Sequence, residues 1–307
     1  MHILVTGGAG FIGSHIVERF HSTDTVTVLD NFRSGFRHNL DGLRVRLVEG
    51  SVTDRALVDG LMAGVDYVFH LAALVSVPES MDKPGEAVAI NVQGTLHVLE
   101  AARANKVKKV VISSSAAIYG NNPDVPKRET MLPEPRSPYA ITKLDDEYYG
   151  RMFTEDFGLP VVALRYFNVF GPRQNPRSQY AAAVPIFIDR CLKGEELVIY
   201  GDGEQTRDFV YVKDIVAANA LAAQATATGV FNIACGRSMS INTLAATLQQ
   251  LTGSASRITH AGERAGDVKH SLAATDRASD VLEFTPAFSV EQGLAETIAW
   301  MRSRKTS

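Results

Sequence analysis

The chain has 307 residues, 45% of them hydrophobic and 21% charged, which is ordinary for a globular protein of one large or two smaller domains. The formal net charge of −3 gives no reason to expect nucleic acid as a partner, and the lack of an 18-residue apolar run predicts no transmembrane helix. A strand-like run begins by His2 or Ile3 and leaves no room for a signal peptide, so we expect a cytoplasmic protein. Cys191 and Cys235 have apolar neighbours, which favours buried free thiols over a disulfide.

The first pattern is ILVTGGAGFIGSHIVERF, residues 3–20, in which a short apolar strand passes through a glycine-rich turn into an amphipathic helix. Gly8, Gly10 and Gly13 fit G-x-G-x-x-G, and Gly7, Gly10 and Gly13 fit the looser G-x-x-G-x-x-G. The free N–H groups and the dipole at the start of a helix attract an anion. A tight turn alone would use the same glycines, so the motif needs a second feature beside it.

That second feature is TVTVLDN, residues 25–31, a predicted strand that ends in Asp30, seventeen residues after Gly13. An acid at this place typically holds the ribose hydroxyls of a dinucleotide and repels the 2′-phosphate of NADP. Arg33 is an opposing feature, because a nearby arginine can accommodate that phosphate. Together the turn and Asp30 indicate a dinucleotide site that favours NAD.

Strand-like and helical runs then alternate along the chain. Strands are expected at 45–50, 65–73, 108–115 and 160–168, and helices at 54–63, 84–105 and 139–157. This alternation predicts an α/β fold of the Rossmann type, a doubly wound parallel sheet with helices on both faces.

After residue 168 the pattern changes to a Pro- and Arg-rich loop and then to smaller, mixed elements. We expect a helix at 181–193, strands near 197–200 and 208–212, and helices at 213–225, 240–252 and 289–303. The expected organisation is a Rossmann domain at 1–168 and a smaller mixed α/β domain at 169–307, with about 210–235 crossing back to the first. Substrate would lie in the crevice between them, at the carboxyl ends of the strands.

The stretch SPYAITKLDDEYY places Tyr139 and Lys143 four residues apart, on one face of a helix. A nearby ammonium favours the phenolate, which makes Tyr139 a candidate general base or acid. Tyr-x-x-x-Lys is also a common accidental spacing on helices. The catalytic interpretation is strengthened by Ser113, Ser114 and Ser115, which end an apolar strand at the edge where active sites collect, although serines there are often simple turn residues.

Taken together, the chain resembles the extended short-chain dehydrogenase/reductase family, and within it the UDP-hexose (UDP-glucose and UDP-N-acetylglucosamine) 4-epimerases. The motifs that carry the resemblance lie in family order between residues 3 and 271: VTGGAGFIGSH, LDN, HLAALVSVPES, NVQGTLHVLEAA, SSSAAIYG, SPYAITK, LRYFNVFGPRQ, YGDGEQTRDFVYVKD and RAGDVKHS.

The resemblance implies NAD as cofactor and no metal, with the pyrophosphate on the glycine turn and Lys143 on the nicotinamide ribose. The cofactor-binding residues that it implies are Gly7, Gly10, Phe11, Ile12, Gly13, Asp30, Asn31, Ser34, Gly35, Ser51, Val52, Leu71, Ala72, Ala73, Asn91, Ser113, Tyr139, Lys143 and Tyr166. The implied catalytic residues are Ser115, Tyr139 and Lys143. The implied substrate-binding residues are Ser76, Ser114, Ser115, Asn168, Arg207, Arg264, Asp267 and Ser271.

The implied reaction is epimerisation through a 4-keto sugar, in which Tyr139 takes the proton of the 4-hydroxyl, NAD exchanges a hydride with C4, and two arginines tether the diphosphate. Two residues depart from the family pattern: Ser51 stands where an acid commonly contacts adenine, and Val75 where relatives carry Lys or Gly. Ser271 stands where relatives restricted to UDP-glucose and UDP-galactose carry Tyr, which favours acceptance of N-acetylated sugars as well.

Two rival functions remain open. A 4,6-dehydratase or decarboxylase could share the fold, but Ala116 and Ala117 stand where dehydratases of the family carry Asp-Glu. A non-catalytic nucleotide-binding module would typically lose the Tyr or the Lys, and this chain keeps both.

The expected assembly is a homodimer through the helices at 84–105 and 139–157, which form a four-helix interface in the resembled family. Both helices carry more apolar residues than one buried face needs: Ala87, Val88, Val92 and Leu96 on the first, and Tyr148, Tyr149 and Met152 on the second. The simpler alternative is that both helices merely cover the sheet.

Overall fold

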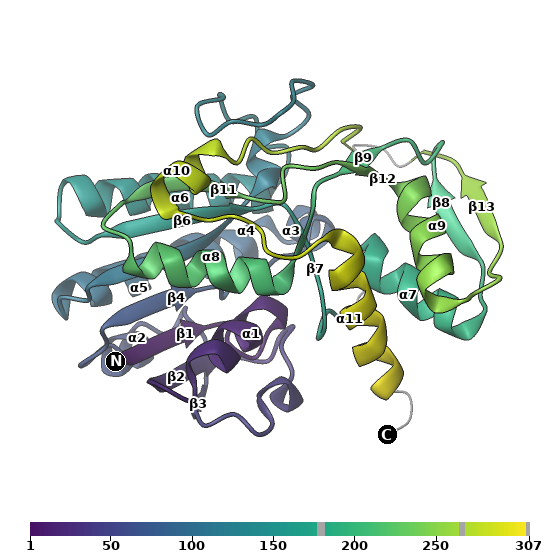
Figure 1. Ribbon diagram of the computed structural model, residues 1–307. Helices are drawn as coiled ribbons and strands as arrows, with labels where there is room; N and C mark the ends of the chain where they lie inside the picture. The colour runs from purple at the N-terminus through teal and green to yellow at the C-terminus, as the bar shows by residue number, and fades with distance from the viewer. Residues whose placement is uncertain (177–181, 264–267, 305–307) are drawn as a thin grey trace.

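The computed structural model describes residues 1–176, 182–263 and 268–304. Its main sheet is made of β1 (His2–Thr6), β2 (Thr25–Asp30), β3 (Arg46–Glu49), β4 (Tyr67–His70), β5 (Lys109–Ser115), β6 (Val161–Tyr166) and β11 (Gly229–Ile233) (Figure 1). All seven strands run parallel, in the order β11-β6-β5-β4-β1-β2-β3. The reversal of order at β1 confirms the predicted Rossmann-type, doubly wound α/β fold.

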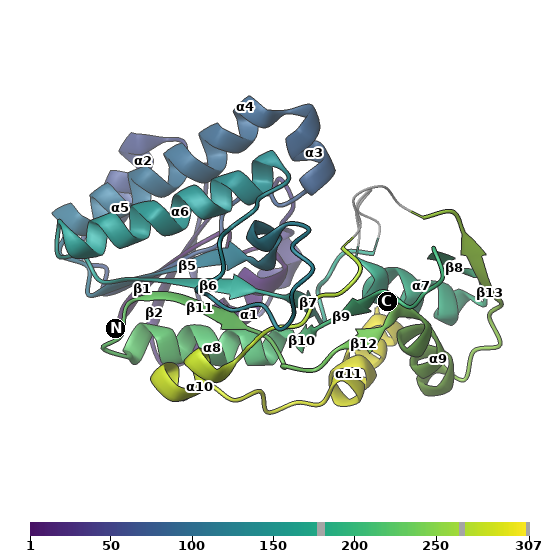
Figure 2. The same ribbon diagram turned by 90° about the horizontal axis from the view of Figure 1, so that it is seen from above.

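Helices cover both faces of this sheet, as Figure 2 shows. One layer holds α2 (Arg55–Leu61), α5 (Gly94–Ala104) and α6 (Pro138–Glu155), extended by the short helices α3 (Val77–Asp82) and α4 (Pro84–Ala87). The other layer holds α1 (Phe11–Phe20) and α8 (Val212–Gln224), with α10 (Asp276–Leu282) beside them. Strands covered on both faces read as continuous apolar runs, and β6 is buried at every position.

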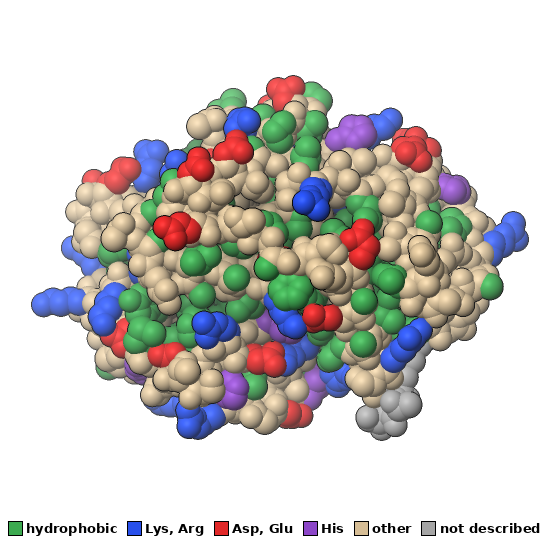
Figure 3. Space-filling model, viewed as in Figure 1, with side chains coloured by type: hydrophobic (Ala, Val, Ile, Leu, Met, Phe, Trp, Pro, Cys, Tyr) green, Lys and Arg blue, Asp and Glu red, His purple; other side chains and the backbone are tan. Residues whose placement is uncertain are grey.

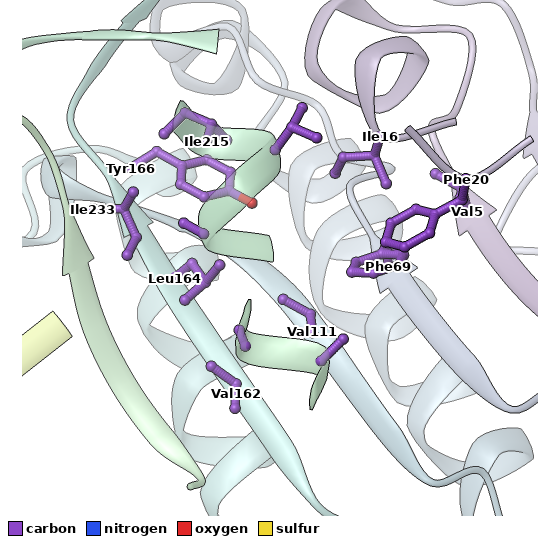
Figure 4. Packing of buried hydrophobic residues seen from close by; sticks show 14 of the residues in the cluster. Val5, Ile16, Phe20, Phe69, Val111, Val162, Leu164, Tyr166, Ile215 and Ile233 are labelled. Atoms are coloured by element: carbon purple, nitrogen blue, oxygen red, sulfur yellow. The ribbon is translucent and has the colours of Figure 1, made fainter. Parts of the chain in front are cut away.

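The core between the sheet and the layer of α1 and α8 is a single cluster of aliphatic and aromatic side chains (Figure 4). Phe20 of α1 stacks on Phe69 of β4 with ring centroids 5.4 Å apart. Ile215 of α8 and Ile233 of β11 belong to the same cluster. Because each such side chain stabilises the fold by about 1.5–3 kcal/mol on burial, this cluster holds β1 and the turn after it in place.

A smaller body lies beside the carboxyl ends of the strands. It contains α7 (Ala183–Lys193), β8 (Leu197–Tyr200), β9 (Thr206–Arg207), β12 (Met239–Ser240), α9 (Ile241–Thr252), β13 (Ile258–Ala261) and α11 (Val290–Ser303). β7 (Asn168–Phe170) pairs in parallel with β10 (Phe209–Tyr211), apart from the main sheet. From β10 the chain returns through α8 and β11 to the edge of the main sheet, beside β6.

Two predicted elements differ from expectation in ways that shape the cleft. The strand expected at 65–73 ends at His70. The Leu71 N–H still donates to the Thr6 carbonyl oxygen, but β1 turns away at Gly7, so the residues after Leu71 have no continuation of β1 to pair with. The helix expected at 84–105 is divided by a π-helical stretch, Val88–Gln93. Such wide turns often occur at functional sites, and this one carries the buried Asn91.

The surface shows no concentration of one charge on the face seen in Figure 3, where Lys and Arg side chains alternate with Asp and Glu. Within the described residues, no helix is long and apolar enough to cross a membrane. Cys191 and Cys235 are both free, the first buried and the second half-buried.

Candidate active site

The turn between β1 and α1 is too tight for side chains. Gly7 has a φ of +69°, and a Cβ there would lie 2.7 Å from the Ala72 nitrogen. A Cβ on Gly13 would lie 2.2 Å from the Gly7 carbonyl oxygen. Gly10 caps α1 without any side-chain cap, so the first N–H groups of the helix remain available to a ligand. This cradle fits the pyrophosphate of a dinucleotide such as NAD.

Asp30 lies at the end of β2, beside the turn. Its carboxylate accepts the Ala9 N–H at 2.9 Å and the Phe32 N–H at 2.8 Å. Burial raises the pKa of this carboxyl, although the two backbone N–H groups oppose the shift. Asp30 therefore fixes the turn against β2 and also presents a carboxylate to the cleft.

One cleft of about 1260 Å³ runs from the glycine turn to the smaller body. Every predicted site residue in the described part of the chain lines this cleft, except Gly35, Asn91 and Ser271. Arg264 and Asp267 lie outside the described residues. The structure thus brings the predicted cofactor residues, the Ser-Tyr-Lys set and two predicted substrate residues, Asn168 and Arg207, to one cavity.

The three exceptions lie behind or beside the cleft wall. A Cβ on Gly35 would meet Ala9 C at 2.8 Å, so this residue packs against the turn itself. Asn91 is fully buried and accepts the Leu74 N–H at 2.7 Å, which fixes the loop that forms one wall. Ser271 donates its N–H to Thr206 O at 3.1 Å and so lies beside the strand that carries Arg207.

The candidate acid–base group begins α6. Ser137 caps this helix and Pro138 occupies its first position, which fixes where Tyr139 starts the first turn. The Tyr139 N–H donates to the Ser80 hydroxyl of α3 at 3.1 Å. Lys143 follows one turn later, with 2% of its surface exposed, and still lines the cleft.

The serines come from the neighbouring strand. Ser115 is the last residue of β5, and its hydroxyl accepts the Ala117 N–H at 3.1 Å. Because β5 ends at the edge of the fold where α6 begins, Ser115 and Tyr139 both reach the cleft. This arrangement suits proton exchange with one substrate hydroxyl held between them.

A buried ion pair supports these residues from behind, and the sequence interpretation missed it. Glu147, one turn after Lys143, accepts the Arg165 Nε at 2.8 Å and Nη2 at 2.7 Å, and also the Ser114 hydroxyl. Arg165 donates a further bond to the Tyr119 hydroxyl at 2.8 Å. The available signal was the spacing of Glu147 from Lys143, together with an arginine in the otherwise apolar run of β6.

A Rossmann sheet with this glycine turn, and with a Ser-Tyr-Lys set at the carboxyl edge, defines an extended short-chain dehydrogenase/reductase. The family model described as "NAD dependent epimerase/dehydratase family" matches residues 3–234. The chain therefore belongs to the NAD-dependent epimerase/dehydratase family, among its UDP-hexose 4-epimerase relatives, and its cofactor is NAD.

The solved structures include two close matches. A UDP-N-acetylglucosamine 4-epimerase from Methanobrevibacter ruminantium M1, in complex with UDP-N-acetylmuramic acid, is 44% identical with a TM-score of 0.96, covering 99% of this chain and 98% of the other. A UDP-glucose 4-epimerase from Thermotoga maritima, with UDP-glucose, is 41% identical with a TM-score of 0.96, covering 99% and 100%. A curated relative from Bacillus cytotoxicus, 36% identical over 97% of both chains, is a UDP-N-acetyl-alpha-D-glucosaminuronate decarboxylase.

Proposed function

We propose that this enzyme is a 4-epimerase that interconverts UDP-glucose with UDP-galactose and UDP-N-acetylglucosamine with UDP-N-acetylgalactosamine. The observation that carries the proposal is the convergence of Ser115, Tyr139 and Lys143 on the cleft that also contains the glycine turn. A hydroxyl, a phenol and an ammonium at one place can hold and deprotonate a sugar hydroxyl. The two solved epimerase relatives support the same reaction.

In this proposal Tyr139 takes the proton from the sugar 4-hydroxyl and later returns it, while Ser115 holds the same hydroxyl by a hydrogen bond. Lys143 stabilises the phenolate form of Tyr139 by its positive charge. NAD, when bound on the glycine turn, supplies the reversible oxidation and reduction at C4. Arg207, at the far side of the cleft, is suited to the diphosphate, because a guanidinium binds phosphate oxygens in a bidentate manner.

A dehydratase or decarboxylase is the competing activity, because relatives of this chain include a decarboxylase. Elimination at C5 and C6 of the sugar would need a further acid–base pair beside Ser115. The next two residues are Ala116 and Ala117, whose methyl groups cannot exchange protons. This favours a reaction in which Tyr139 alone handles the proton.

Acceptance of both sugar classes requires that the cleft has room for a 2-acetamido group, so the size and freedom of the side chains that line it decide the matter. Val75 lines the cleft but is 56% exposed, so its side chain can turn toward solvent when a larger sugar enters. Ala182 and Ala183 also line it and leave room in the wall of the smaller body. A 2-acetamido group adds modest volume, and a cleft lined in this way does not exclude it by shape.

The test is product analysis by chromatography after incubation of the purified protein with UDP-glucose, UDP-N-acetylglucosamine, UDP-glucuronate and dTDP-glucose separately. We expect the C4 epimer from both of the first two nucleotide sugars. A 4-keto-6-deoxy sugar from dTDP-glucose, or release of carbon dioxide from UDP-glucuronate without epimerisation of the others, would replace the proposal by the corresponding rival activity.

We also propose that the enzyme is a homodimer through the layer of α3 to α6. Met81, Val88, Ile141 and Tyr148 are large apolar side chains left exposed there, and Tyr148 is 56% exposed. Met152 and Tyr149 are partly buried against the core below, so the simpler role of covering the sheet accounts for part of this layer. Light scattering at micromolar protein should give twice the mass of the chain; a monomeric mass would contradict the proposal.

A further inference from the structure

A second carboxyl lies buried directly beside the candidate acid–base pair. Asp146 of α6 has no exposed surface, and its Oδ2 lies 3.4 Å from the Lys143 Nζ. Its other oxygen, Oδ1, has no hydrogen-bond partner among the described residues. A half-paired carboxylate in the interior is unfavourable for folding, so its presence beside Lys143 calls for a reason in the chemistry of the site.

The groups around Asp146 show which charges act on it. Asp145 adjoins it on α6, and Thr95 of α5 lies beside it. From β4, His70 joins its Nε2 to the Thr95 hydroxyl at 2.9 Å and its Nδ1 to the Thr6 hydroxyl at 2.7 Å. Burial, together with the Lys143 charge, lowers the pKa of His70 to about 3, so this histidine is neutral at physiological pH.

These contacts leave the ammonium of Lys143 facing one full negative charge at close range. In the low-dielectric interior such a counter-ion offsets a large part of the field that the ammonium exerts on its other neighbours. Tyr139, one helical turn before Lys143, is the neighbour that depends on this field in the proposed reaction. The charge state of Asp146 therefore determines how strongly Lys143 favours the phenolate.

We propose that Asp146 is a positioning residue of the reaction, whose carboxylate anchors the Lys143 ammonium and sets how strongly that ammonium stabilises the Tyr139 phenolate. This inference rests on the proposed function of the same site. Burial raises the pKa of Asp146 to about 6, against the pull of Lys143. As the pH falls toward 6, Asp146 takes up a proton and loses its negative charge. The positive field of Lys143 is then no longer offset by that charge, and it favours the Tyr139 phenolate more strongly.

The primary test follows the phenolate and does not depend on turnover. Tyrosinate absorbance is measured against pH on NAD-loaded protein, and the spectrum of the same protein carrying Tyr139→Phe is subtracted, so that Tyr139 alone is observed. Asp146→Asn keeps the shape and removes the charge, and it should lower the midpoint of the titration by about one pH unit. It should also sharpen the curve, because two coupled groups titrate over a wider range than one.

Asp145→Asn is the matched control, because it removes the adjacent, half-exposed carboxylate of the same helix. It should leave the midpoint in place. An equal shift in both variants, or no shift in Asp146→Asn, would overturn the proposal. Asp146→Ala is the second charge-removing variant; if neither variant can be obtained as folded, NAD-loaded protein, the carboxyl is a structural requirement and the proposal is likewise overturned.

Activity provides the second readout. In Asp146→Asn the acid limb of kcat/KM should move to lower pH by the same amount while KM stays unchanged, whereas a merely structural role would lower kcat equally at every pH. If the unmodified enzyme turns over no UDP-sugar, the proposed function is wrong. The phenolate titration would still decide the role of Asp146.

Discussion

Arg33 and Glu79 form an ion pair, with the Arg33 Nη2 lying 2.7 Å from the Glu79 Oε1, that joins the loop after β2 to α3 at the edge of the cleft. Nη1 of the same guanidinium lies 2.5 Å from Glu86 of α4. Arg33 was the one sequence feature that favoured NADP over NAD. Two carboxylates already engage this guanidinium, so it is not free to bind a 2′-phosphate, and Asp30 adds a negative charge nearby.

The denatured enzyme should therefore release NAD and not NADP. Glu79→Gln combined with Glu86→Gln frees the guanidinium and should raise the released ratio of NADP to NAD roughly tenfold, a change of about 1.4 kcal/mol. Glu100→Gln, which removes an exposed carboxylate paired with Arg55, serves as the control and should leave the ratio unchanged. Stoichiometric NADP from the unmodified protein would show that Arg33 prevails over its two partners.

Tyr139→Phe tests the proposed proton carrier. The ring still packs at the start of α6, but the hydroxyl is gone, so kcat should fall by about 10²–10⁴-fold, with UDP affinity little changed. Tyr148→Phe removes a hydroxyl from an exposed tyrosine of the same helix and should leave kcat unaltered. Initial rates with UDP-glucose and UDP binding by calorimetry measure both quantities. Near-normal turnover in Tyr139→Phe would rule this residue out as the base.

The buried ion pair of Glu147 and Arg165 should contribute measurably to the stability of the fold. Both side chains are almost fully buried, so Glu147→Gln leaves the guanidinium without its counter-ion and should lower the free energy of unfolding by about 3–5 kcal/mol. Glu155→Gln breaks an exposed pair with Arg151 on the same helix and should cost less than about 1 kcal/mol. Urea unfolding followed by circular dichroism compares the two variants. A similar small loss in both would mean that the buried pair contributes little.

Buried His70 should make the stability of the protein depend on pH. Its folded-state pKa of about 3 lies below the value of 6.5 expected when unfolded, so between these values the unfolded chain binds the extra proton and acid favours unfolding. From pH 7 to pH 5 this one group should lower the free energy of unfolding by about 2 kcal/mol. Asp146 and Asp208, whose pKa values burial raises to about 6, act in the opposite direction.

The effect of His70 is isolated by His70→Gln, which cannot titrate. The loss of stability between pH 7 and pH 5 should be about 2 kcal/mol smaller in this variant than in the unmodified protein, as measured by urea unfolding at each pH. His97→Gln is the control, because this histidine is partly exposed and its Nδ1 contacts the backbone carbonyl oxygen of Val52 at 3.0 Å. An unchanged pH dependence in His70→Gln would show that folding does not lower the pKa of His70.

The sequence was sufficient for the sheet and for the glycine turn, because both depend on local pattern: alternating apolar runs, and glycines that no other residue could replace at Gly7 and Gly13. It was insufficient for contacts between distant segments. Nothing in the local pattern shows that the Asn91 side chain accepts a hydrogen bond from the Leu74 N–H, since that bond depends on how the π-helical stretch packs. Asp146 likewise looks like a surface acid in KLDDE until the packing of α5 on α6 buries it.

The last prediction concerns the choice of sugar and rests on the proposed function. Ser271 does not itself line the cleft, but its N–H bonds Thr206 O, beside the strand residue Arg207 that does. A tyrosine at 271 would carry a phenol ring from this place toward the sugar end of the cleft and reduce its volume. An excluded volume discriminates between substrates more sharply than a lost contact, because the larger sugar cannot shift to avoid it.

Ser271→Tyr should therefore abolish turnover of UDP-N-acetylglucosamine and UDP-N-acetylgalactosamine while UDP-glucose and UDP-galactose are still interconverted. Ser271→Ala is the control, because it keeps the small volume and removes only the hydroxyl, and it should turn over both classes. The ratio of kcat/KM for the two classes, measured by chromatography of the products, decides the matter. An equal loss on both classes in Ser271→Tyr would mean that the ring disturbs Arg207 and the diphosphate it is proposed to hold, and no change on either would mean that the side chain at 271 points away from the sugar.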